Sequence, residues 1–396
     1  MIPATGHLNL MKSAAKATLN SPFLKPLPHM KIRQIDLYRA NILMKEPFRI
    51  ATMTVDVAQC VFAAVHTDDG RTGWGEANPY WRIVGETQST VLAAGRELAR
   101  VLLGQDADAV EARARDMSGF LAGNPTVRSM FDMALWDLVG QRAGLPLYAL
   151  WGGSSRPIPT DRTVGINTPA KMADSALGFA SRQFPAIKLK IGREPLVDID
   201  AVKSVRRKIG TGIPLRVDAN QGFSTTHAAY VLRALEHEGI EYCEQPVNAH
   251  DVDGMAWVRS RTQVPIMADE SVFTASDALR LIRASACDYM NVKLSKTGGI
   301  LEALNVSSVA AAAGIRCGIG CMTESRLGLT AAAHVAQASS NFVFADLDGA
   351  DFHAEDPILG GMTYGSNGTV RTPDSPGLGA APSPEFLERC ESFTLI

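Results

Sequence analysis

The chain has 396 residues, of which 46% are hydrophobic and 20% are charged, and this composition is typical of a globular protein with one large or two ordinary domains. The formal net charge is −2 with both signs interspersed, so neither a nucleic acid nor an anionic membrane is an expected partner. Six cysteines are spread along the chain, which argues against a disulfide framework, and no apolar run reaches the ~20 residues that a membrane span needs.

The N-terminal segment, residues 1–29, contains three lysines, no arginine and no acidic residue. A transit peptide is rich in arginine and a secretion signal has a long apolar core, and this segment has neither feature. We therefore expect a loosely packed extension ahead of a domain that begins near Met30, in a cytoplasmic protein.

A first domain is expected over residues 30–155. Alternating apolar and polar residues predict three strands, at 32–38, 58–66 and 72–76. The turn Asp68-Asp69-Gly70 joins the last two strands, so the strands are expected to form an antiparallel meander. Apolar residues at helical spacing predict three helices, at 87–103, 107–121 and 125–143. Together these elements make a small α+β domain.

Beyond Gly152-Gly153-Ser154-Ser155, short apolar strands alternate with amphipathic helices over residues 156–350. Strands are expected near residues 163, 188, 216, 242, 267, 291, 317 and 344. Helices are expected at 169–183, 196–209, 226–238, 251–262, 275–284 and 299–313. This alternation predicts a βα-barrel, in which functional groups lie at the C-terminal ends of the strands. Residues 351–396 are expected to return to the first domain.

Charged residues end five consecutive strands of this barrel. From Lys190 the steps to the following four are 28, 26, 25 and 24 residues, which is about one strand, one helix and two loops each time. A single charge at a strand end is usually a solvated rim residue, but five in register are not independent accidents. We therefore expect one cluster at the barrel mouth, made of Lys190, Asp218, Glu244, Asp269 and Lys293.

The three carboxylates of this cluster would converge on one point. Bare carboxylates held together repel one another, and an oxygen-preferring divalent cation is the simplest remedy. Mg2+ tolerates three carboxylates together with water and substrate oxygens, and Mn2+ is a possible substitute. Asn220 and Glu270 are either supports for the metal ligands or simple loop residues.

The two lysines would flank the metal from opposite sides. A cation bound to a substrate carboxylate stabilises the enediolate that forms when the neighbouring carbon loses its proton, and a lysine with a depressed pKa is a suitable base. Lys188 would add positive charge and help to keep Lys190 neutral. One base on each face predicts racemisation or epimerisation. With one lysine as a spectator, elimination or cycloisomerisation remains open.

From Met30 to about Gly379 the chain resembles the muconate lactonising enzyme-like branch of the enolase superfamily. The resemblance is carried by five ordered motifs, Lys188-Leu189-Lys190, Asp218-Ala219-Asn220, Glu244-Gln245-Pro246, Asp269-Glu270-Ser271 and Asn291-Val292-Lys293. It implies a modified TIM barrel, (β/α)7β, with an N-terminal α+β capping domain, one Mg2+ on the three carboxylates, Lys190 and Lys293 as paired acid and base, and a homo-oligomer.

A finer resemblance is to dipeptide epimerases of the L-Ala-D/L-Glu kind. It rests on the run from Gly320 to Gly328 and on Asp346-Leu347-Asp348-Gly349 after the last strand. In that family an Asp-x-Asp pair binds the free α-ammonium of the dipeptide, and two acceptors one residue apart suit a single cation. The same pair is also a common turn signal. The implied substrate contacts are Lys188, Thr163, Cys321, Thr323, Asp346, Asp348 and Met53.

Substrate choice in this branch depends on capping-domain loops, here residues 48–54 and 79–85. The L-Ala-D/L-Glu epimerases supply an arginine near the position of Met53, and methionine cannot pair with an acidic side chain. Met53, Tyr80 and Trp81 would suit an apolar or cation-accepting pocket, while Arg49 and Arg82 keep an acidic substrate open. Packing under the lid is the simpler alternative.

The sequence thus predicts a Mg2+-dependent isomerase that epimerises a dipeptide at the α-carbon of its C-terminal residue. Within the fold, an N-acyl amino acid racemase and a muconate-type cycloisomerase are the alternatives. Outside it, a Schiff-base aldolase also uses a barrel lysine, and a binding protein without catalysis is possible.

Overall fold

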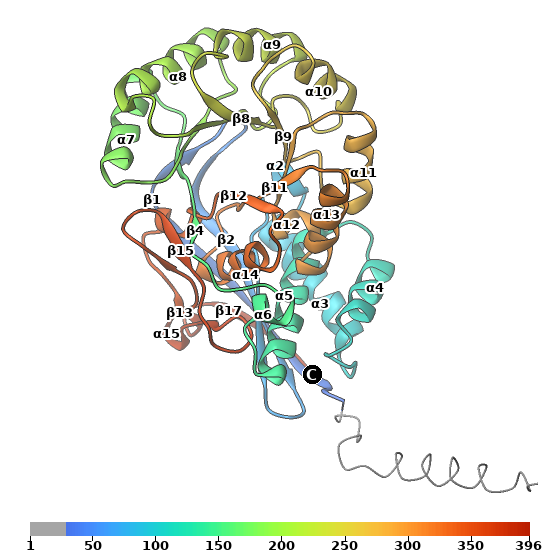
Figure 1. The fold of residues 1–396 in the computed structure, drawn as a ribbon. Coiled ribbons are helices and arrows are strands. Elements are labelled where there is room, and N and C mark those ends of the chain that lie inside the picture. The colour runs from blue at the N-terminus through green and yellow to red at the C-terminus, as the bar shows by residue number, and fades with distance from the viewer. Residues whose placement is uncertain (1–28) are drawn as a thin grey trace, which may run out of the picture.

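The computed structural model describes residues 29–396, so the predicted N-terminal extension lies outside the described residues except for its last one. In Figure 1 the helices α7 to α11 form an arc around the barrel strands, and the long strands β1 and β2 belong to a separate layer beside the barrel. The C-terminus lies next to this N-terminal layer. The architecture is the predicted (β/α)7β barrel with an α+β capping domain.

The capping domain is built on a four-stranded antiparallel sheet in the order β17-β1-β2-β3. Its strands are β1 (Ile32–Arg49), β2 (Thr54–Thr67), β3 (Thr72–Ala77) and β17 (Glu391–Leu395). The predicted meander is confirmed, but β1 is longer than the predicted strand at 32–38. Its pairing with β2 continues to Arg49 opposite Thr54, after a shift of register between Leu43 and Phe48 that contains Pro47, which has no N–H to donate.

The helices of this domain are α2 (Trp81–Val84), α3 (Gln88–Leu102), α4 (Val110–Phe120), α5 (Pro125–Ala143) and α6 (Leu147–Leu150). The three predicted helices of this domain agree with α3, α4 and α5 to within a few residues, and two short helices, α2 and α6, were not predicted. Helix α5 lies directly on β3, and a side chain at Gly75 would collide with the carbonyl oxygen of Met130. Glycine in the strand therefore allows the close approach of helix and sheet.

The barrel consists of eight strands in sequence order, parallel to one another. They are β5 (Arg162–Val164), β6 (Ile187–Lys190), β7 (Leu215–Asp218), β8 (Ile240–Glu244), β9 (Ile266–Ala268), β10 (Tyr289–Val292), β11 (Arg316–Ile319) and β12 (Phe342–Ala345). The helices between them are α7 (Pro169–Ser181), α8 (Pro195–Ile209), α9 (Thr225–Ala234), α10 (Val252–Arg259), α11 (Ala275–Arg283), α12 (Leu294–Thr297), α13 (Ile300–Ala312) and α14 (Arg326–Ala338). The first and last strands of the barrel are linked by a hydrogen bond, in which the N–H of Asp161, just before β5, donates to the carbonyl oxygen of Ala345 at the end of β12 (3.1 Å).

Helix α14 was not among the predicted helices. Nearly all of its residues are buried, including the polar Thr330 and His334. Its sequence nevertheless carries the amphipathic period on which the other predictions relied, so the signal for this helix was present and was not used.

After the barrel, the chain runs back along the capping domain in short elements. They are η2 (Gly349–Phe352), β13 (Ile358–Gly360), β14 (Thr363–Tyr364), β15 (Thr369–Arg371), β16 (Ala380–Pro382) and α15 (Pro384–Leu387). Strands β14 and β15 form a three-stranded sheet with β4 (Ile158–Pro159), which pairs with β15. Strand β17 then joins the capping sheet beside β1.

Two buried carboxylates of the capping domain accept hydrogen bonds from backbone N–H groups of the barrel. Glu76 accepts hydrogen bonds from the N–H groups of Ser325 and Gly328 (both 2.8 Å), at the start of α14. Asp132 accepts one from the N–H of Ile300 (2.5 Å), at the start of α13. Each carboxylate satisfies donors that a helix leaves free at its N-terminus, so the two domains are fixed to each other at two helix ends.

Cysteines and long apolar helices were the two features that composition addressed. All six cysteines are free thiols, and five of them are buried. Within residues 29–396 we find no helix with the length and apolar character needed to cross a membrane.

Candidate active site

The predicted alignment of charges at the strand ends is present in the barrel. Lys190 pairs laterally with Asp218, and Asp218 with Glu244, across three neighbouring strands. Asp269 follows directly after β9, and Lys293 directly after β10. All five side chains are buried, and the three carboxylates have no exposed surface. The C-terminal ends of parallel strands lie at the same edge of a sheet, so charged residues that recur once per strand in the sequence lie close together in the barrel.

Two lysines contact the carboxylates from opposite ends of the row. Lys190 Nζ lies 2.6 Å from Asp218 Oδ2. Lys293 Nζ lies 2.7 Å from Asp269 Oδ2 and 3.7 Å from Glu244 Oε1. The two ammonium groups therefore lie on either side of the carboxylates, because the strands that carry the carboxylates lie between the strands of the lysines.

Lys188 occupies the centre of the barrel. Its Nζ lies 2.7 Å from Glu244 Oε2, 2.7 Å from Asp346 Oδ2 and 3.2 Å from Asp218 Oδ2. Burial opposes its charge, but these carboxylates raise the pKa of Lys188 well above its usual value. The side chain is 0% exposed and its ammonium group is enclosed by these carboxylates, and the role of Lys188 as a substrate contact stays a prediction.

The expected depressed lysine pKa is not found at Lys293. Burial lowers it, but Asp269 and Glu244 more than offset this effect, and the pKa of Lys293 is raised well above its usual value. A group that neutralised the same carboxylates would remove the effect and leave burial to favour the neutral amine.

Several oxygen atoms around the carboxylates have acceptor capacity to spare. Beside the three carboxylates, the buried oxygens Asn220 Oδ1, Glu270 Oε2 and Asn291 Oδ1 have no hydrogen-bond partner among residues 29–396. Glu244 Oε2 and Asp269 Oδ1 also accept no aligned hydrogen bond, although ammonium groups lie 2.7 and 2.6 Å away. Unsatisfied buried oxygens are costly, and a concentrated set of hard oxygen donors fits a divalent cation such as Mg2+.

Asn220 and Glu270 lie beside the carboxylates and bind each other. The N–H of Asn220 donates to Asp218 Oδ1 (2.9 Å), and its side-chain amide donates to Glu270 Oε1 (3.3 Å). Asn220 adopts a left-handed backbone conformation with φ +40°, which asparagine tolerates better than most residues. These bonds connect the ends of β7 and β9.

Two supporting residues were not predicted from the sequence. Lys296 Nζ lies 2.6 Å from Asp269 Oδ1 and donates to the carbonyl oxygen of Asn291 (3.1 Å). Gln245 Oε1 accepts the N–H groups of Asp269 (2.9 Å) and Ser271 (3.1 Å). The available signals were the spacing of Lys296, one helical turn after Lys293, and the position of Gln245 directly after a metal-ligand candidate.

Asn291 and Gly320 were also missed. The side-chain amide of Asn291 donates to Glu244 Oε1 (2.8 Å). A Cβ atom at position 320 would lie 2.7 Å from the Asn291 amide and 2.9 Å from Lys293 Cε. Only glycine leaves room there for both side chains.

A second acidic pair lies beyond β12. Asp346 binds Lys188, while Asp348 Oδ2 accepts the N–H of Thr163 (2.8 Å) and lies 3.6 Å from Arg162 Nη1. Cys321 Sγ and oxygens of both aspartates lie within 4.8 Å of one another. Two carboxylates and a thiol at this spacing suit one cationic group.

The two aspartates differ in charge state. Burial raises the pKa of Asp348 to about 7, with Asp346 adding to the shift and Arg162 opposing it. Burial also acts on Asp346, but Lys188 and the neighbouring lysines hold the pKa of Asp346 well below its usual value. Asp346 is therefore ionised throughout the neutral range, whereas Asp348 titrates within it.

Two predicted substrate contacts have other partners in the structure. The N–H and Oγ1 of Thr323 both donate to Asn78 Oδ1 (3.1 Å each), so Thr323 joins the barrel to the capping domain. Met53 lies in the short β1–β2 connection, where its carbonyl accepts the N–H of Ile50 (3.0 Å), and its half-buried side chain packs against the hydrophobic core.

Two cavities lie beside the cluster, and both capping-domain loops contribute to their walls. A cavity of about 350 Å³ is lined by Arg82 and Ile83 of α2 and by Glu270. A cavity of about 170 Å³ is lined by Phe48 and Thr163 among others.

Comparison with known proteins supports the family expected from the motifs. Residues 34–152 match the mandelate racemase/muconate lactonizing enzyme N-terminal domain, and residues 171–386 match the enolase C-terminal domain-like family. A D-Ala-D/L-Ala epimerase from Cytophaga hutchinsonii is 38% identical over 92% of this chain and 100% of its own length. A crystal structure of the Cytophaga hutchinsonii dipeptide epimerase, complexed with Mg and D-Ala-L-Val, matches 93% of this chain and all of its own with a TM-score of 0.91.

Two further relatives bear on the substrate. A hydrophobic dipeptide epimerase from Enterococcus faecalis is 38% identical over 88% of this chain and 99% of its own length. An N-succinyl-L-Arg/Lys racemase from Bacillus cereus is 31% identical over 92% of this chain and 99% of its own length. The predicted resemblance to dipeptide epimerases and the predicted enzyme class, an isomerase, are confirmed. The chain belongs to the mandelate racemase/muconate lactonizing enzyme family of the enolase superfamily.

Proposed function

We propose that the protein epimerises a dipeptide at the α-carbon of its C-terminal residue, with Lys190 and Lys293 as the two bases. The observation that carries the proposal is their placement at opposite ends of the Asp218, Glu244 and Asp269 row. A substrate carboxylate bound at the row would have its α-carbon between two amines. One lysine can then remove the α-proton and the other can return a proton to the opposite face.

The three carboxylates of the row are the proposed ligands of Mg2+, with Mn2+ as a possible substitute. The bound cation would supply a positive charge for the substrate carboxylate and for the negative charge that develops when the α-proton leaves. Gln245, Asn291 and Lys296 hold the carboxylates in place through the hydrogen bonds and ion pairs described above.

Asp346 and Asp348 are the proposed site for the α-ammonium group of the dipeptide. Lys188 fixes Asp346, and the backbone N–H of Thr163 fixes Asp348, so both acceptors are held before the substrate arrives. Cys321 lies against the same two carboxylates and completes the wall of this site.

An apolar side chain on the C-terminal residue is the proposed preference. Met53 offers no charge to an acidic group, and two relatives are named for Ala-Ala and hydrophobic dipeptides. A cytoplasmic location and a homo-oligomer remain predictions from the sequence.

Racemisation of an N-acyl amino acid is the second candidate. Arg162 lies 3.6 Å from Asp348, and a guanidinium group at that place favours an anionic or neutral N-terminal group over an ammonium group. The Bacillus cereus relative, named for N-succinyl substrates, shows that this chemistry occurs among the relatives.

Incubation in D2O with Mg2+ separates the two candidates. A library of dipeptides and a matched library of N-acyl amino acids are analysed by mass for α-deuterium. We expect incorporation into dipeptides, and loss of that incorporation in Asp348→Ala. Incorporation only into N-acyl amino acids, unchanged by Asp348→Ala, would show that the racemase assignment is the correct one.

A further inference from the structure

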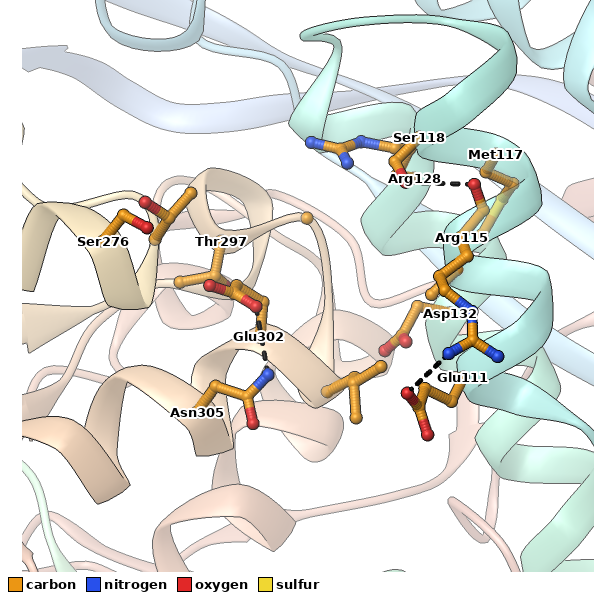
Figure 2. A pocket seen from close by; sticks show the side chains of 14 residues that line it. Glu111, Arg115, Met117, Ser118, Arg128, Asp132, Ser276, Thr297, Glu302 and Asn305 are labelled. Carbon is orange, nitrogen blue, oxygen red and sulfur yellow. Dashed lines mark hydrogen bonds and ion pairs between the residues drawn. The ribbon is translucent and has the colours of Figure 1, made fainter.

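A cavity of about 430 Å³ lies between the capping domain and the barrel, and none of the proposed active-site residues lines it. Figure 2 shows Glu111 and Arg115 of α4 on one wall and Ser276, Glu302 and Asn305 of α11 and α13 on the facing wall. Arg128 of α5 and Thr297 and Gly298 at the end of α12 also contribute to it. The volume is within the range of small-molecule sites.

The acidic groups around this cavity already have partners. Glu111 pairs with Arg115 (3.0 Å). Glu302 accepts the N–H of Ala275 (2.7 Å), at the start of α11, and the side-chain amide of Asn305 (3.1 Å). Asp132 is engaged at the start of α13, as described above, and burial raises its pKa to about 7. All three carboxyl groups therefore already bind a helix N-terminus or an arginine.

Arg128 is the exception among these groups. Within residues 29–396 its guanidinium forms no hydrogen bond or ion pair, and its Nε is buried. Burial lowers the pKa of Arg128, and Glu86 and Glu302, acting from beyond ion-pair distance, offset this only in part. The guanidinium packs against Gly298, 3.4 Å from where a Cβ would stand. A partly desolvated arginine without an acidic partner is a site for an external anion.

The rest of the wall limits the chemistry of that anion. Ala114, Met117 and Leu301 are apolar, and Ser276 adds a hydroxyl in the first turn of α11. We propose that this cavity binds a small organic carboxylate whose anionic group pairs with Arg128 and whose apolar part packs on Ala114, Met117 and Leu301. Such a ligand bridges the two domains behind α12, the helix that follows Lys293.

Calorimetric titration of the full-length protein with sodium benzoate tests the proposal, with benzamide as the uncharged ligand of the same shape. We expect benzoate to bind at one site per chain and benzamide to bind at least about tenfold more weakly, because it forms no charge-assisted pair. Arg128→Gln should weaken benzoate binding by at least about tenfold. Arg100→Gln, which removes the same charge from α3 outside the cavity, is the matched control and should leave binding unchanged.

A second substitution keeps the test independent of the arginine. Ala114→Phe fills the apolar part of the cavity and should abolish benzoate binding, while the melting temperature shows whether either variant still folds. Absence of benzoate binding to the unmodified protein contradicts the proposal. Binding that persists in both Arg128→Gln and Ala114→Phe places the ligand elsewhere and contradicts it equally.

Discussion

Lys188 Nζ lies 2.7 Å from Asp346 Oδ2, and this buried contact joins the proposed metal site to the proposed ammonium site. The same ammonium group contacts Glu244 and Asp218. One enclosed positive charge thus holds three carboxylates from three strands, each of which has a separate role in the proposed reaction.

Removal of this charge should destabilise the barrel. Lys188→Met leaves three buried carboxylates without their shared counter-charge, and loss of one partner from a buried pair costs about 3–5 kcal/mol. We expect the urea midpoint of the metal-free protein to fall with an unchanged m value. Lys45→Met, at an exposed lysine, is the control. A loss below about 1 kcal/mol would mean that Lys188 contributes little to the fold.

The cation requirement follows from the three carboxylates. EDTA should abolish α-proton exchange, and added Mg2+ should restore it. Asp269→Asn removes one charged ligand and should weaken Mg2+ binding, measured by calorimetry, by at least about tenfold. Asp116→Asn, on the exposed side of α4, is the matched control. Full activity in EDTA would instead favour a reaction without a metal, such as Schiff-base chemistry.

The pKa of Asp348 predicts how substrate binding depends on pH. Because this carboxyl has a pKa of about 7 in the folded protein, it is protonated in acid and ionised in base. An ammonium group binds the ionised form, so KM for a dipeptide should fall as pH rises through 7. The expected change approaches tenfold per unit below pH 7. Asp348→Asn should flatten the profile, and an identical profile in this variant would assign the dependence to another group.

The interdomain carboxyl of Asp132 predicts a pH-dependent stability. Burial raises its folded pKa to about 7, whereas the unfolded value is about 4. Between these values the folded state binds the extra proton, so the free energy of unfolding should decrease as pH rises from 4 to 7, by up to about 1.4 kcal/mol per unit. Asp132→Asn keeps an acceptor for Ile300 N–H and should remove this component. Urea titrations at several pH values measure it, and equal slopes in both proteins would contradict the assignment.

The sequence is most informative about residues that recur with the strand–helix period of the barrel. Lys190, Asp218 and Glu244 could be placed side by side because each ends a parallel strand, and strand ends meet at one edge. The meander and helix α5 were equally predictable, since alternation and helical spacing are local signals.

Features that depend on packing between distant segments could not be predicted. Thr323 binds Asn78 of the capping domain, 245 residues away, and no local pattern in the sequence indicates this contact. Gly320 matters because Lys293 and Asn291 occupy the space of its missing side chain. Helix α14, by contrast, carries an amphipathic period and could have been predicted from its sequence.

The central claim is that two lysines act on opposite faces of one α-carbon. It is tested most directly by incubating each diastereomer of an Ala-Ala dipeptide in D2O with Lys190→Ala and with Lys293→Ala. We predict that neither variant epimerises, and that each exchanges the α-proton of only one diastereomer, the opposite one in each case. Epimerisation at the unmodified rate in either variant, or exchange of the same diastereomer in both, would contradict the two-base account.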